Sequence, residues 1–229
     1  MTGPDPTADA PLQQGLFDPS TYPGWHPDGP AAILGTRVVP IEHDDVALLD
    51  GDWRWSVAFG SNACPDRLVD KDIAVHGALL LPARLHGWRV AWEARRSPMT
   101  GAVPVTLVPV QGHVLDTWVL GFPPAGIEAM DFSEGRLAGR YHLARVGPVQ
   151  VGDVWLLDPG VAYTAGPEAV LLTAPDGVTP LWLDDADQAA AVARLEEVER
   201  SGAPTIPAAQ ATDIVPLGDF PRTELEARS

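Results

Sequence analysis

A series of short apolar runs between Trp53 and Leu157, separated by Gly, Pro and Asp, is the feature that most constrains the fold. The runs are rich in β-branched and aromatic residues, and turn residues recur at the spacing typical of a β-barrel or β-sandwich. We therefore expect an α+β, mostly β domain over residues 51–160, built as a small mixed β-barrel. The expected strands are residues 55–59, 79–81, 83–92, 103–110, 117–122, 141–146 and 154–157.

Two short helices fit between these strands. Proline is favoured in the first turn of a helix, so one helix is expected to begin at Pro65 and the other to span Pro124 to Met130.

Different patterns flank this central region. Residues 1–50 are expected to form a proline-rich arm, partly disordered, because proline fixes φ and removes an amide donor. Aromatic residues such as Phe17, Tyr22 and Trp25 give the arm a way to pack on the domain. The seven prolines in its first thirty residues are Pro4, Pro6, Pro11, Pro19, Pro23, Pro27 and Pro30.

Residues 161–229 are expected to form a strand–helix extension. Residues 170–172 and 180–183 resemble strand pieces, and a helix is expected from a cap at Asp184 or Asp185 through Arg200. Gly202 and Pro204 would end that helix.

The net charge of the chain limits the classes of partner that it is expected to bind. With 31 acidic residues against 15 Lys and Arg, the formal net charge is -16, which opposes binding to nucleic acid or to an anionic membrane. The single cysteine, Cys64, rules out an intrachain disulfide and fits a cytoplasmic location. The first basic residue is Arg37, so the N-terminus lacks the positive segment of a signal peptide, and no apolar run reaches membrane-helix length.

The segment Phe59-Gly60-Ser61-Asn62 follows the strand ending in Val57-Ala58 and precedes the helix expected at Pro65. Backbone N–H groups in such a loop can bind a carboxylate or stabilise an oxyanion. Taken alone, the pattern is more often a simple turn with Ser and Asn as helix caps.

Glu134 lies 72 residues beyond Asn62, among Met130, Phe132 and Gly135. These neighbours favour a partly buried acid, and burial raises a carboxyl pKa toward the range useful for general acid/base catalysis. Taken alone, Ser133-Glu134-Gly135 is more often an ordinary surface turn that ends a helix.

Together, the two segments resemble the signature of the γ-glutamylcyclotransferase-like family. That family carries an aromatic-Gly-Ser-Asn loop, then an Asp-x-x-Glu-Gly element with the catalytic glutamate, then a tyrosine. Asp131 to Gly135 and Tyr141 match the later pieces. Residues 82–89 and 116–120 resemble the intervening strands, so the resemblance covers about residues 53–155. The family loop usually begins with Tyr, and here Phe59 lacks that hydroxyl.

The resemblance implies a cofactor-free and metal-free reaction, of the acyltransferase or lyase type, on a small-molecule γ-glutamyl substrate. The substrate's α-amine attacks its γ-carbonyl, giving 5-oxoproline and a released amine or amino acid. Glu134 would be the general acid/base, the Gly60–Asn62 loop would bind the carboxylate or oxyanion, and Phe59 and Tyr141 would line the pocket.

Other chemistries are less well supported by the residues. Cys64 follows the loop near a helix start, but no histidine is singled out by spacing as its partner. The histidines never pair at metal-ligand spacing, and Gly60-Ser61-Asn62 is not a serine-hydrolase elbow. The alternative from another class is a catalytically silent member of the fold that acts as a binding or accessory protein.

Overall fold

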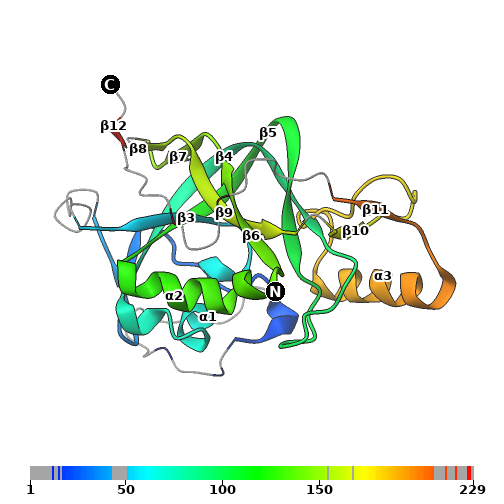
Figure 1. The fold of residues 1–229 in the computed structure, drawn as a ribbon, viewed down its shortest axis with the longest axis horizontal. Helices are drawn as coiled ribbons and strands as arrows, with labels where there is room; N and C mark the ends of the chain where they lie inside the picture. Colours follow the sequence, from blue (N-terminus) through cyan, green and yellow to red (C-terminus); the bar gives the residue numbers. More distant parts are fainter. Residues whose placement is uncertain are drawn as a thin grey trace.

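A large mixed β-sheet organises the chain (Figure 1) in this computed structural model, which describes residues 12, 15, 17–42, 51–153, 155–166, 168–208, 215, 220 and 226–227. The strand order is β12-β8-β7-β4-β5-β3-β9-β6; β1 also pairs with β4, and β2 pairs with β1. Pairing is antiparallel except between β3 and β9. The strands are β1 (Ala31–Leu34), β2 (Arg37–Pro40), β3 (Arg54–Ala58), β4 (Ala78–Trp92), β5 (Val105–Phe122), β6 (Tyr141–Val146), β7 (Val149–Val151), β8 (Trp155–Leu157), β9 (Gly160–Ala165) and β12 (Glu226–Ala227).

Three α-helices accompany the sheet in the described part of the chain: α1 (Pro65–Asp70), α2 (Pro124–Ser133) and α3 (Gln188–Ser201). The two helix starts expected at Pro65 and Pro124 are confirmed, as is the α+β, mostly β class, although the described strands form an open sheet and not the closed barrel expected. The described residues also contain four 3-10 turns: η1 (Pro19–Thr21), η3 (Ser61–Ala63), η4 (Ala74–His76) and η5 (Arg136–Ala138). A second, small sheet consists of β10 (Val170–Leu172) and β11 (Thr205–Pro207).

The long hairpin of β4 and β5 is the backbone of the sheet. The sequence predicted two strands in each of these stretches, and that division is wrong, because each stretch is one continuous strand paired from Leu79–Gly121 to Trp92–Val105. Pro82 does not interrupt β4, because its carbonyl accepts a hydrogen bond from Gly152 at 3.1 Å, on the side away from β5. The N and O of one strand residue point to the same side, so the missing N–H of Pro82 costs no bond to β5.

Both faces of the sheet are buried where β3, β4 and β5 meet. Leu79 and Leu81 belong to one apolar cluster, and Leu80 between them belongs to the other. Because side chains alternate across a strand, a strand covered on both faces has an unbroken apolar sequence. Helices α1 and α2 lie on the second face (Figure 1), where Leu68 of α1 and Met130 of α2 are fully buried.

The two flanking segments contribute to this core. Strand β1 pairs with β4, and Tyr22 packs on Trp92 with ring centroids 5.4 Å apart. On the C-terminal side, Val215 is buried in the second cluster. The boundaries expected for the central domain at residues 51 and 160 stay a prediction. Disorder was expected for the first dozen residues, of which only Leu12 is described. Leu12 is buried and its N–H donates to the Thr36 carbonyl at 2.6 Å, so the expectation is wrong for this residue.

The C-terminal helix differs from the expectation at its start. Asp187 is its N-cap and accepts a hydrogen bond from the Ala190 N–H at 2.8 Å, whereas Asp184 and Asp185 contact Arg89. The predicted end at Gly202 is confirmed, with φ of 67°. Residues 180–183, expected as a strand piece, form only isolated bridges, among them Ala91 with Trp182.

The hairpin offers a direct test of the core. Leu85 is fully buried, whereas Val114 on the paired strand is 45% exposed. We expect Leu85→Ala to lower the free energy of unfolding by about 2–5 kcal/mol, because it removes buried methyl groups and leaves a cavity. Val114→Ala is the matched control and should change it by less than about 1 kcal/mol. Urea denaturation measures both, and equal effects would contradict the described packing.

Candidate active site

One small cavity brings together the residues that the sequence predicts to be catalytic or substrate-binding. Its volume is about 120 Å³, and its lining includes Phe59, Gly60, Ser61, Asn62, Glu134 and Tyr141. The cavity is smaller than the roughly 300–1,000 Å³ typical of pockets for drug-sized ligands, so it suits a small ligand fragment. The roles assigned to these residues remain predictions.

The loop side of the cavity is built by the end of β3. Gly60 lies close to the Tyr22 side chain, and a Cβ atom at this position would clash with the Tyr22 hydroxyl oxygen. The next residues form η3, in which the Ala63 N–H donates to the Gly60 carbonyl at 3.1 Å. The backbone N–H groups of Gly60 and Asn62 have no acceptor among the described residues, so both can donate to a ligand.

Glu134 enters the cavity from the end of α2. It is the C-cap of that helix, and its N–H donates to the Met130 carbonyl at 2.9 Å. Gly135 follows with φ of 63°, a left-handed conformation that glycine adopts without strain. Glu134 is only 8% exposed, so the prediction of a buried acid is confirmed.

A buried ion pair connects Glu134 to the loop. Lys71, the C-cap of α1, donates hydrogen bonds to Glu134 Oε1 and to Asn62 Oδ1. The side chains of Lys71 and Glu134 are 8% and 9% exposed, so solvent screens the pair weakly. Burial lowers the pKa of Lys71, and the charge of Glu134 opposes that shift.

A second network, made of hydrogen bonds and an ion pair, holds the chain on both sides of Glu134. Arg136 is 3% exposed in its side chain and pairs with Asp131 at 3.1 Å, while its other nitrogen donates to the Val215 carbonyl. The Tyr163 hydroxyl donates to Asp131 at 2.7 Å. These contacts fix the chain on both sides of Glu134.

Tyr141 has its own charged partners. Its hydroxyl donates to Glu93 at 2.8 Å and accepts from Arg95 at 3.1 Å, and Arg95 pairs with Glu93 at 2.6 Å. Burial raises the pKa of the Glu93 carboxyl, and Arg95 opposes that shift. Tyr141 therefore lines the cavity while its hydroxyl is hydrogen-bonded to Glu93 and Arg95.

Sequence reasoning missed the charged residues that surround Glu134. Arg67, Lys71, Arg95 and Arg140 line the same cavity, and Glu134 is the one acidic residue in its described lining. A signal for Lys71 was available, since it is the only lysine of the chain. Phe59 has no hydroxyl where the family loop usually has a tyrosine. Two other tyrosines, Tyr22 and Tyr163, line the same cavity.

Cys64 is poorly placed to act as a nucleophile. It is 1% exposed, and burial raises the pKa of its thiol to about 11, so the reactive thiolate is scarce near neutral pH.

No group of three or more potential metal-ligating side chains occurs among the described residues. None of the described helices is both long and apolar enough to cross a membrane.

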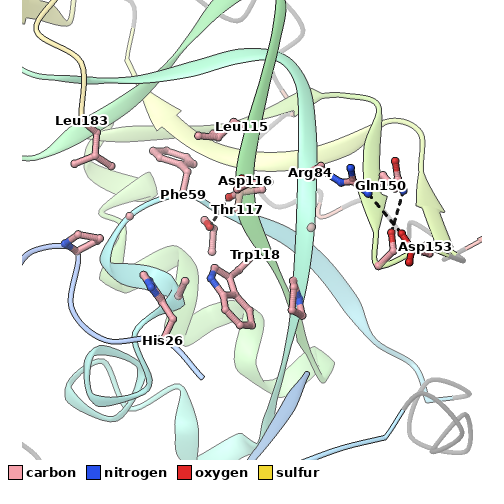
Figure 2. A pocket seen from close by; sticks show the side chains of 17 residues that line it. His26, Phe59, Arg84, Leu115, Asp116, Thr117, Trp118, Gln150, Asp153 and Leu183 are labelled. Atoms are coloured by element: carbon pink, nitrogen blue, oxygen red, sulfur yellow. Dashed lines mark hydrogen bonds and ion pairs between the residues drawn. The ribbon is translucent and has the colours of Figure 1, made fainter. Parts of the chain in front are cut away.

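A larger cavity of about 520 Å³ (Figure 2) shares Phe59 and Gly60 with the lining of the smaller cavity. His26 and Trp118 stack along it, with ring centroids 5.8 Å apart. Thr117 donates to the Ala58 carbonyl at 2.8 Å. This cavity does not include Glu134, so the smaller cavity is the better candidate for chemistry despite its size.

Comparisons with known proteins give partial matches only. No family model matches the chain, and no curated protein matches it. A solved structure titled gamma-glutamyl cyclotransferase is similar at 17% identity and a TM-score of 0.43, over 49% of this chain and 66% of that one. An uncharacterized human protein is similar at 17% identity and a TM-score of 0.41, over 50% and 67% of the two chains.

A yeast gamma glutamyl cyclotransferase specific to glutathione is similar at 15% identity and a TM-score of 0.38, over 71% of this chain and 92% of that one. This chain spans just under two thirds of the first structure named above. Similarity at this level supports no conclusion about the activity of this chain.

The network around Arg136 yields a stability test. We expect Arg136→Ala to lower the free energy of unfolding by about 3 kcal/mol, because it leaves a largely buried carboxylate without its ion-pair partner. Arg140→Ala is the control, since Arg140 is exposed and should contribute less than about 1 kcal/mol. Chemical denaturation compares them, and an equal, small loss in both variants would count against the network.

Proposed function

We propose that this protein is a γ-glutamylcyclotransferase-type enzyme, which converts a γ-glutamyl amide to 5-oxoproline and releases an amine or amino acid. The observation that supports this most is the meeting of Glu134 with the Gly60-Ser61-Asn62 loop in one cavity. These are the two segments on which the sequence resemblance rests, and they are 72 residues apart in the chain.

The chemistry requires little from the protein. The α-amine of the substrate attacks its own γ-carbonyl and closes a five-membered ring, so no protein nucleophile is needed. Holding the reacting atoms in the right geometry can supply much of the rate. Glu134 accepts the proton that the attacking amine loses, as the general acid/base of the reaction.

The polar groups of the cavity suit a γ-glutamyl group. Four of the fifteen Lys and Arg residues line this one cavity of an acidic chain, which favours an anionic ligand such as the α-carboxylate. The N–H groups of Gly60 and Asn62, which have no acceptor among the described residues, can stabilise the oxygen that becomes negative during ring closure.

The test is release of 5-oxoproline from a panel of γ-glutamyl amino acids and γ-glutamyl amines, followed by mass spectrometry. We expect Glu134→Gln to lower kcat by about 10²–10⁴-fold, because the amide cannot accept the proton. Glu128→Gln is the control, since Glu128 lies on the exposed face of α2 and should keep full activity.

Two results would contradict the proposal. Folded wild-type protein that releases no 5-oxoproline from any member of the panel would favour a silent binding or accessory protein. Equal release by the wild type and Glu134→Gln would remove Glu134 from the mechanism.

A further inference from the structure

Lys71 is an unusual residue for its position. It is the only lysine in the chain, its side chain is 8% exposed, and its ammonium contacts both signature segments through Asn62 and Glu134. Charged lysines are rarely buried unless paired, and an apolar replacement of a buried ion pair is often neutral or stabilising. Stability alone therefore accounts poorly for this pair.

One proton of Lys71 is left for a ligand. An ammonium group has three N–H donors. Asn62 and Glu134 accept two of them, and no other acceptor for Lys71 occurs among the described residues. Lys71 also lines the cavity, so its third N–H can reach a molecule bound there.

The proposed reaction needs a proton in a second place. When the C–N bond to the leaving group breaks, the leaving nitrogen must gain a proton, because an amine anion is a very poor leaving group. A single carboxylate would have to reach the attacking and the leaving nitrogen in turn. A carboxylate and an ammonium held side by side can serve both nitrogens in one arrangement.

We propose that Lys71 is the general acid of this reaction, a role that rests on the proposed function. The Glu134 carboxylate takes a proton from the attacking α-amine as the new C–N bond forms. The Lys71 ammonium gives a proton to the leaving nitrogen as the old C–N bond breaks. Glu134 then passes its proton to the Lys71 amine through their hydrogen bond, which restores both groups.

The surroundings of Lys71 support this role. Burial lowers its pKa and the positive charge of Arg67 acts in the same direction, while Glu134 acts against them. A pKa closer to neutrality makes an ammonium a better proton donor at working pH. The hydrogen bond to Asn62 holds the amine in place on the loop side.

The test compares two substrates that differ in how much they need an acid. γ-Glutamyl ethylamide has a strongly basic leaving amine, and its 2,2,2-trifluoroethylamide analogue is nearly the same size but has a much less basic one. We expect Lys71→Met to lower kcat by about 10²-fold or more on the ethylamide and by less than about 10-fold on the fluorinated analogue. If the enzyme turns over only those members of the panel whose leaving group is an amino acid, γ-glutamyl-alanine and its trifluoro analogue replace this pair.

Two further variants separate acid catalysis from positioning. Lys71→Arg keeps the positive charge and a partner for Glu134 but releases its proton very poorly, so it should show the same dependence on the leaving group. Glu134→Gln should lose activity on both substrates, because the base is needed in each. Circular dichroism establishes that each variant is folded.

The outcomes are distinct. An equal loss on both substrates in Lys71→Met and Lys71→Arg would overturn the acid role and leave the proposed function standing. Full activity of Lys71→Met on the ethylamide would overturn it as well. Absence of turnover by the folded wild type on every substrate would instead overturn the proposed function.

Discussion

The buried ion pair of Lys71 and Glu134 is the interaction on which the candidate site depends. It joins the C-terminal ends of α1 and α2, and Lys71 extends the connection to the loop through Asn62. An acidic side chain at a helix C-terminus is disfavoured by the helix dipole, and the ammonium of Lys71 offsets this. Because the pair is shielded from solvent, losing either partner would leave a charge buried and uncompensated.

The rest of the fold serves to bring these helix ends together. The long β4–β5 hairpin is covered on both faces, and one face carries α1 and α2 with Leu68 and Met130 in its core. The arm before residue 50 also takes part, because Tyr22 packs on Trp92 and reaches the loop at Gly60. The cavity thus combines segments from the arm, the sheet and two helices, and it concentrates positive charge in an acidic chain.

Local patterns in the sequence predicted much of the fold and of the candidate site. The features that these patterns missed depend on contacts between residues far apart in the chain. The starts of α1 and α2 follow from Pro65 and Pro124. The burial predicted for Glu134 is confirmed, although of the two apolar neighbours behind that prediction Met130 is buried and Phe132 is exposed. The continuity of β4 through Pro82 depends on which side its missing N–H would face, and that is set by the neighbouring strands. Lys71 and Glu134 are 63 residues apart, so no local pattern pairs them.

The most direct test of this account is a titration of Lys71 by NMR in protein labelled at lysine. A chain with one lysine gives one side-chain lysine signal, so its pKa is read without ambiguity. The account predicts a pKa below the ordinary value of about 10.4 in the wild type, and a still lower one in Glu134→Gln, because the carboxylate that favours the ammonium is gone. A lysine signal that titrates at the ordinary value and is unchanged in Glu134→Gln would contradict the buried pair.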